Sequence, residues 1–182
     1  MEQTAEKPAA KPLLKLDLGC GKNKQQGYIG VDSRDFPGVD QVVDLTKPWP
    51  WEDESVEETF CSHFIEHLEP MERVHFVNEL YRVLIPGGKA FCVVPNWSSA
   101  RAYGDLTHKW PPVCNFWLPY LSKSWRLVNA PHNDFYTCNF DSTGGYNLNP
   151  ALQTRNIEYQ QHALEHFIEA GQDLFFTLIK VV

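Results

Sequence analysis

Short apolar segments separated by turns run through the first half of the chain. Five of them have the length and composition of β-strands, at residues 13–18, 28–31, 41–43, 56–62 and 89–94. Nearly continuous apolar strands, without strict alternation of polar and apolar residues, are typical of a parallel sheet buried on both faces. The pattern therefore predicts an α/β domain around such a sheet.

One helix is indicated between the fourth and fifth of these segments. Pro70 suits the first helical position, because its missing N–H would have no partner there, and Pro86-Gly87-Gly88 ends the helix. Between these limits apolar residues recur at spacings of three and four, and so form one stripe: Met71, Val74, Val77, Leu80, Tyr81 and Leu84. A strand, a helix and a parallel strand in succession predict a right-handed crossover.

The second half of the chain has weaker periodicity. Residues 97–140 are rich in aromatic residues, Pro and Asn, and predict long loops. A second helix is predicted over residues 157–170, with Asn156 as its N-cap. Its buried stripe would be Leu164, Phe167 and Ile168. Residues 173–181 predict a closing strand, and residues 135–140 a partner for it.

Composition and charge narrow the class of protein. A chain of 182 residues, 43% of them hydrophobic, can bury a core without metals or disulfides. The net charge of −7 argues against a protein that neutralises phosphates along nucleic acid. No apolar run approaches the ~18–20 residues that span a bilayer, and no secretory signal is seen. We expect a disordered tail over residues 1–12, a single domain over residues 13–182, and a cytoplasmic location with reduced cysteines.

Three acidic residues stand at or just after the ends of successive predicted strands: Asp17, Asp32 and Asp44. The carboxyl ends of parallel strands form the ligand crevice of such sheets. Gly19 and Gly21 follow the first strand and allow a sharp turn close to a ligand. A carboxylate at the second position can accept hydrogen bonds from both hydroxyls of a ribose, and the third position can reach an adenine edge.

The turn after the first strand helps to decide which nucleoside cofactor, NAD or S-adenosylmethionine (SAM), the chain would bind. NAD requires a GxGxxG turn and a helix N-terminus for its pyrophosphate. Here the third glycine position is Lys24, and no long helix fits between Gly21 and Tyr28. SAM carries no phosphate and needs only the turn, the ribose carboxylate and a polar adenine contact. The sequence therefore favours SAM.

Five segments in order resemble motifs of the class I SAM-dependent methyltransferases. Residues 16–21 resemble the first motif, Asp32 matches the ribose-binding acid, and Asp44-Leu45 matches the adenine-contacting position. Residues 62–68 resemble the segment after the fourth strand, and residues 83–89 resemble the L-x-P-G-G turn before the fifth. The resemblance covers about residues 13–96 and is greatest to enzymes that methylate small molecules or sugars, including predicted phage-borne members.

This resemblance implies a doubly wound, mostly parallel, seven-stranded Rossmann-like sheet with an antiparallel last strand. It implies a cofactor-binding half over residues 13–96 and substrate-side loops and closing strands over residues 97–182. The implied SAM-binding residues are Asp17, Gly19, Cys20, Gly21, Asp32, Asp44, Leu45, Ser62 and His63. The chain departs from the family in its short N-terminus and in residues 22–27, which are too few for the usual first crossover helix. A non-catalytic SAM-fold binding or scaffold protein is therefore an open alternative.

Residues 103–110 hold the candidate catalytic side chains. They resemble a Gly-Asp-Pro-x-His segment of related predicted methyltransferases, with Leu106 in place of the proline. His108 could deprotonate a hydroxyl acceptor as a general base, with Asp105 orienting its ring. The alternative is a His–Asp hydrogen bond that only orders the loop. Glu66 and His67 either brace the region before Pro70 or take a direct part.

The predicted reaction is methyl transfer to a small-molecule or sugar acceptor. Six aromatic side chains could line the acceptor pocket, under a mobile cover formed by residues 97–125: Trp97, Trp110, Phe116, Trp117, Tyr120 and Trp125. Amino-methylating DNA enzymes have an (Asp/Asn/Ser)-Pro-Pro-aromatic motif after the fourth strand, where this chain reads Cys61-Ser62-His63-Phe64, so a nucleic-acid acceptor is less favoured. No metal site is predicted, since His162 and His166 lack further ligands in the sequence.

Overall fold

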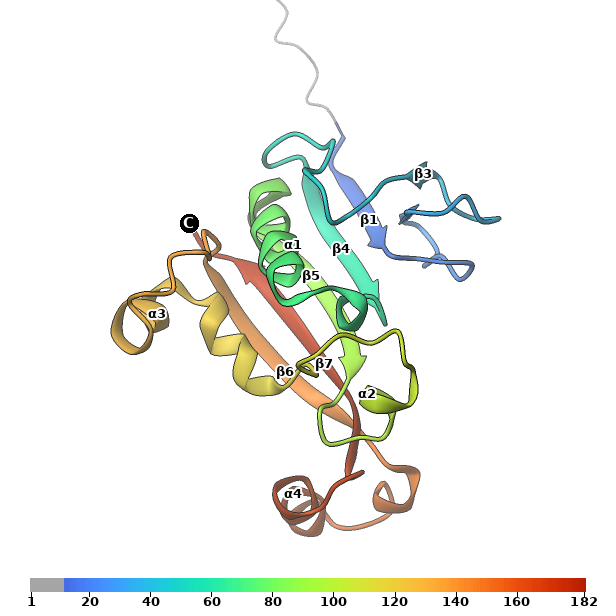
Figure 1. Ribbon diagram of the computed structural model, residues 1–182, viewed down its shortest axis with the longest axis vertical. Coiled ribbons are helices and arrows are strands. Elements are labelled where there is room, and N and C mark those ends of the chain that lie inside the picture. The colour runs from blue at the N-terminus through green and yellow to red at the C-terminus, as the bar shows by residue number, and fades with distance from the viewer. Residues whose placement is uncertain (1–11) are drawn as a thin grey trace, which may run out of the picture.

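The computed structural model describes residues 12–182, so residues 1–11 of the predicted tail lie outside it. The described chain forms a seven-stranded sheet of order β3-β2-β1-β4-β5-β7-β6 (Figure 1). The strands are β1 Leu14–Leu18, β2 Ile29–Asp32, β3 Gln41–Val42, β4 Val56–Ser62, β5 Leu84–Pro95, β6 Phe140–Leu148 and β7 Gly171–Lys180. The first five strands pair in parallel, whereas β7 is antiparallel to both β5 and β6. The order runs outward in both directions from β1 and β4, which confirms the predicted doubly wound, mostly parallel sheet.

Helices occur only in the later connections of the described chain. They are η1 Ile65–His67, α1 Pro70–Val83, α2 Arg101–Gly104, η2 Asn115–Leu121, α3 Lys123–Asn129, η3 Pro150–Leu152 and α4 Ile157–His166, where η marks a 3-10 helix. No helix connects β1 to β2, as the short segment 22–27 predicts, and none connects β2 to β3 or β3 to β4. None of the helices over residues 12–182 combines the length and apolarity needed to cross a bilayer.

Helix α1 follows the sequence prediction closely. It begins at Pro70, and the backbone N–H of Glu69 donates to the Glu72 carboxylate at 2.8 Å, which satisfies one donor of the first turn. The predicted stripe is buried or half-buried except for Met71, which is 57% exposed. The chain then enters β5 directly at Leu84, and Pro86-Gly87-Gly88 forms an irregularity within that strand rather than a separate turn.

The two faces of the sheet differ in burial. On one face, which α1 covers in Figure 1, alternate strand residues are almost fully buried: Leu16, Leu18, Thr59, Cys61, Ala90, Cys92, Phe176 and Leu178. The residues between them point to the opposite face. There Lys89 is exposed and Phe175 is 43% exposed. The expectation of burial on both faces is therefore wrong for this side, because the connections between β1 and β4 supply no helix to cover it.

The second half departs further from the prediction. The strand expected over residues 135–140 starts only at Phe140 and runs to Leu148 through Ser, Thr and Gly, which carry little strand signal. Helix α4 begins at Ile157, and the side chain of Asn156 accepts the Tyr159 N–H at 2.9 Å, as expected of the N-cap. The predicted buried stripe is wrong for two of its three residues, because only Leu164 is half-buried. Phe167 and Ile168 lie beyond the helix and are 47% and 79% exposed, since α4 lies at the end of the sheet (Figure 1).

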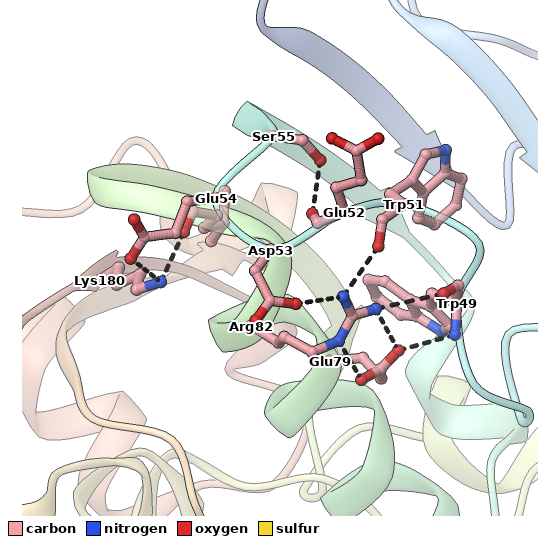
Figure 2. A network of polar contacts seen from close by, with 10 residues as sticks. Trp49, Trp51, Glu52, Asp53, Glu54, Ser55, Glu79, Arg82 and Lys180 are labelled. Atoms are coloured by element: carbon pink, nitrogen blue, oxygen red, sulfur yellow. Dashed lines mark hydrogen bonds and ion pairs between the residues drawn. The ribbon is translucent and has the colours of Figure 1, made fainter.

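A polar network closes the amino-terminal edge of the sheet (Figure 2). Arg82 of α1 forms ion pairs of 2.8 Å with both Glu79 and Asp53. Lys180 at the end of β7 reaches Glu54 at 3.2 Å. These contacts join α1, the loop before β4 and the last strand. They lie at the amino-terminal ends of the parallel strands. The predicted site residues lie at the opposite, carboxyl-terminal ends.

Candidate active site

The turn after β1 is fastened to the end of β2. Gly19 and Gly21 have φ angles of +74° and +53°, a backbone region that glycine enters without strain. The N–H groups of Gly19 and Cys20 both donate to the carbonyl of Val31, at 2.8 and 3.0 Å. The N–H of Gly21 donates to Oδ2 of Asp32 at 3.0 Å. Two motifs that are separate in the sequence thus form one structural unit.

The two glycines of this turn have different surroundings. A Cβ atom on Gly19 would lie 2.5 Å from the ring of Phe64, so this position requires glycine for packing. A Cβ atom on Gly21 would meet nothing within 4 Å. The space beside Gly21 is therefore open to a ligand, whereas that beside Gly19 is already filled by the protein.

Asp17 anchors the short loop between β1 and β2, which connects these strands without a helix. The side chain is 2% exposed, and its Oδ2 accepts the N–H of Gln25 at 2.6 Å. Burial raises the pKa of Asp17, and the Gln25 hydrogen bond and the charge of Lys24 oppose this rise. Lys24 in turn pairs with Asp40 at 2.8 Å. Two carboxylates, those of Asp17 and Asp40, thus hold the adjacent loop residues Gln25 and Lys24.

Asp32 and Asp44 remain accessible at the carboxyl edge. Asp32 is half-buried and accepts N–H groups from Gly21 and Arg34, one on each oxygen, which leaves lone pairs for a ligand. Asp44 is exposed, and hydrogen bonds from the hydroxyl and the N–H of Thr46 lower its pKa. The neighbouring Leu45 is 2% exposed and belongs to the core.

The remaining predicted cofactor residues lie at the same edge. Cys20 is 9% exposed, and burial, together with the charges of Asp17 and Asp32, raises its pKa to about 11. Ser62 ends β4 and is half-buried. His63 follows in the left-handed region, and its Nδ1 lies 3.2 Å from Oε1 of Glu66, a contact that raises the pKa of the imidazole.

Solved structures and a family model identify this arrangement. Residues 32–92 match the family model of a methyltransferase domain, and no curated protein matches the chain. A SAM-dependent methyltransferase from Archaeoglobus fulgidus aligns over 93% of this chain and 86% of its own, with 20% identity and a TM-score of 0.67. The 1,6-didemethyltoxoflavin-N1-methyltransferase of Burkholderia thailandensis, solved with 1,6-didemethyltoxoflavin and S-adenosylhomocysteine, aligns over 94% and 72% at 12% identity and a TM-score of 0.59. The chain has the class I SAM-dependent methyltransferase fold.

Within this methyltransferase fold, a second polar group lies beside His63. Glu66 and His67 belong to η1, and His108 comes from the loop after α2. The rings of His67 and His108 stand edge to face, with centroids 4.8 Å apart. The N–H of Lys109 donates to the carbonyl of Glu66 at 2.8 Å and holds the two segments together. Sequence reasoning named these residues separately and did not predict that they meet.

The hydrogen bond expected between Asp105 and His108 is not formed. Oδ2 of Asp105 lies 4.0 Å from Nε2 of His108, beyond hydrogen-bond distance. Instead Nδ1 of His108 lies 3.1 Å from the carbonyl of Ala102, and Asp105 accepts hydrogen bonds from Thr107. A backbone carbonyl therefore orients the His108 ring, and Asp105 orders the preceding turn.

Arg73 of α1 holds the His108 loop against α1 and the end of η1. Its side chain is nearly buried and donates to the carbonyls of Leu68, Lys109 and Pro111 at 2.9, 2.9 and 2.6 Å. Sequence reasoning missed Arg73. The available signal was an arginine within the apolar periodicity of α1, where a charged group must find several acceptors.

A pocket of about 300 Å³ lies beyond Arg73, between α1 and η2. Three of the aromatic residues expected around an acceptor line it: Phe116, Trp117 and Tyr120. Trp125 packs against Tyr120 with ring centroids 4.8 Å apart. Trp97 and Trp110 are 50% and 75% exposed and do not line this pocket.

Proposed function

We propose that this protein is a SAM-dependent methyltransferase acting on a small-molecule or sugar acceptor. The observation that carries the proposal is the open space beside Gly21, next to a half-buried Asp32 carboxylate that retains free lone pairs. The matching family model and the solved methyltransferases of the same fold support SAM as the cofactor and an enzyme as the class of protein.

In this proposal Asp32 holds the cofactor ribose, and Asp44 lies at the adenine side. Ser62 and His63 at the end of β4 bound the same crevice, while Asp17 acts through the loop that it anchors. Bound SAM would supply a methyl group that is already electrophilic, because it is attached to a sulfonium. The protein's part is therefore to align the acceptor and to exclude water.

The acceptor would approach from the side of the His108 loop. The carbonyl of Ala102 can only accept a hydrogen bond, so the neutral His108 ring carries its hydrogen on Nδ1 and a lone pair on Nε2. This lone pair could receive the proton of the acceptor's hydroxyl. The hydroxyl oxygen would then bond to the methyl carbon of SAM, while the bond between that carbon and the sulfonium sulfur breaks. The division into a cofactor half, residues 13–96, and a substrate side, residues 97–182, is part of the proposal.

The pocket favours a small acceptor over a nucleic acid. Its aromatic walls suit flat rings or the apolar face of a sugar, and the chain has a net charge of −7. The Burkholderia thailandensis enzyme, whose structure holds the small molecule 1,6-didemethyltoxoflavin, has the same fold.

Calorimetric titration with SAM and with S-adenosylhomocysteine tests the cofactor assignment. We expect both to bind at one site per chain, and NAD not to bind. Release of S-adenosylhomocysteine is then followed with panels of sugars and small aromatic acceptors, with single-stranded DNA and RNA as comparison. Binding without turnover on any panel would favour a scaffold protein, and absence of binding would overturn the proposal.

A further inference from the structure

Three potential metal ligands converge beside the proposed methyl-transfer site. Glu66, His67 and His108 each offer one ligand atom, and these atoms all lie within 4.8 Å of one another. Ligand atoms around a tetrahedral ion at 2.0–2.2 Å lie about 3.4 Å apart. Small side-chain movements would therefore bring the three onto one cation.

The Glu66 carboxylate is buried, and only one of its two oxygens has a hydrogen-bond partner. Glu66 is 4% exposed, and its Oε2 atom has no hydrogen-bond partner. The nearby guanidinium of Arg73 is directed to backbone carbonyls, including that of Glu66 itself at 3.5 Å, rather than to the carboxylate. An unpaired buried carboxylate oxygen is costly, and a bound cation would remove this cost.

The hydrogen bonds around both histidines leave the same ring atom free. His108 donates from Nδ1 to the carbonyl of Ala102, so its Nε2 carries the lone pair. The Thr107 hydroxyl lies 2.7 Å from the Asp105 carboxylate, which takes its only hydrogen. Thr107 must then accept from Nδ1 of His67, 3.0 Å away, which leaves Nε2 of His67 for a ligand. Metal-binding histidines are oriented in this way by an acceptor on the other nitrogen.

Two further groups complete the surroundings. Oδ2 of Asp105 lies 4.0 Å from Nε2 of His108 and takes no part in the hydrogen bonds to Thr107. A rotation of this exposed side chain can make it a fourth ligand. His63 holds the other oxygen of Glu66 at 3.2 Å and fixes the direction of its carboxylate.

We propose that Glu66, His67 and His108 bind a divalent transition-metal cation of the zinc type, with Asp105 as a fourth ligand. Two imidazoles and one or two carboxylates form a donor set that suits such ions. A small pocket lined by Asp105 and His108 gives access to the site from outside. Resting on the proposed function, an acceptor oxygen would replace Asp105 in the fourth position, and the cation would favour the deprotonated form of that oxygen, so that His108 serves as a ligand and not as a base.

Zinc titration of the chelator-treated full chain, without SAM, tests the site directly. We expect one tight equivalent of Zn²⁺ by calorimetry, and visible absorption bands of tetrahedral type when Co²⁺ is used instead. Glu66→Gln and His108→Ala should each weaken Zn²⁺ affinity at least ten-fold. The control is His162→Ala, because His162 and His166 form a separate exposed pair with ring centroids 4.4 Å apart.

Folding and function are checked separately. Circular dichroism verifies each variant, and His67→Gln replaces Glu66→Gln if the latter does not fold. Unchanged affinity in a folded Glu66→Gln protein, or loss of binding only in His162→Ala, would overturn the metal site. A protein that binds Zn²⁺ but not SAM would keep the site and lose the proposed function. SAM-dependent turnover that no chelator reduces would overturn the metal's role and leave His108 as the base.

Discussion

The backbone N–H of Gly21 donates to the carboxylate of Asp32 across 3.0 Å, and so joins the turn after β1 to the end of β2. The residue expected to hold the ribose therefore also holds the turn over which the cofactor would lie. Changes at Asp32 must be designed to separate these two tasks.

Replacing Asp32 with Asn keeps an acceptor for the N–H of Gly21 but removes the charge, and it leaves the exposed N–H of Arg34 to hydrogen-bond with water. Charge-assisted hydrogen bonds contribute ~1.5–3 kcal/mol, so we expect SAM affinity to fall about ten-fold or more while the melting temperature changes little. Asp32→Ala should lower both affinity and melting temperature. Calorimetry and thermal unfolding measure the two effects. Asp35→Ala, an exposed carboxylate on the same loop, is the control. An unchanged dissociation constant in folded Asp32→Ala would contradict the ribose assignment.

The two glycines of the turn should respond differently to a side chain. Gly19→Ala places a methyl group against the ring of Phe64, and overpacking of this kind costs about 1–3 kcal/mol of stability, in addition to the strain of a positive φ. Gly21→Val should mainly reduce SAM affinity, because its side chain enters open space, although its positive φ adds a strain of about 1–2 kcal/mol. Urea unfolding and SAM titration compare them.

The Phe64 contact offers an internal check on Gly19. In Gly19→Ala/Phe64→Ala the clash is absent, so the two stability losses should not add. Additive losses would show that backbone strain, rather than the ring of Phe64, requires glycine at this position. Normal SAM binding by Gly21→Val would make the turn purely structural.

Removing the His108 imidazole tests whether His108 takes part in methyl transfer, either as the general base or as a metal ligand. His108→Ala should lower turnover by ~10²–10⁴-fold and leave the SAM dissociation constant unchanged, because the ring lies in the loop after α2 and not in the turn after β1. Asp105→Asn should have a smaller effect under both roles, since Asp105 does not hydrogen-bond to His108 and the loss of a fourth ligand would leave the other three in place. Full turnover in His108→Ala would exclude both the base and the ligand.

The hydrogen bonds of the Arg73 side chain should stabilise the His108 loop. Arg73→Met leaves the carbonyl of Leu68, in a buried hydrogen bond, and the part-buried carbonyls of Lys109 and Pro111 without this donor, and the loss at a buried carbonyl costs about 1–3 kcal/mol. We expect a clear fall in the urea midpoint and faster proteolysis within residues 105–112. Arg155→Met, at an exposed position, should change neither. Equal stability of the two variants would contradict the role given to Arg73.

The thiol of Cys20 should be unreactive at neutral pH. Its pKa is raised to about 11, so the reactive thiolate is scarce at pH 8 and becomes more abundant only as the pH approaches that value. Iodoacetamide labelling followed by mass spectrometry should show slow modification of Cys20 in the folded protein and rapid modification in urea. Labelling at pH 8 as fast as in urea would show that the thiol is not buried as described.

Local patterns in the sequence determine much of this protein. Apolar runs specify the parallel strands, and the spacing of Val74, Val77 and Leu80 specifies α1 because a helix repeats every 3.6 residues. Gly19, Gly21 and Asp32 predict the proposed cofactor crevice because they lie at or just after the ends of two neighbouring strands, β1 and β2. The absence of a helix between β1 and β2 follows from the ten residues, 19–28, that separate the two strands, because a helical crossover needs about a dozen or more.

Tertiary structure decides what depends on distant partners. Strand β6 forms from Ser, Thr and Gly because β7 supplies its hydrogen bonds, and most of the second sheet face is only half-buried because no helix between β1 and β4 covers it. The meeting of Glu66 and His67 with His108 has no local signal at all. It arises because Arg73 and the Lys109–Glu66 hydrogen bond bring two loops together across some 40 residues of chain. The periodicity of a sequence predicts which side chains are buried, but it does not predict which distant loops will meet at one site.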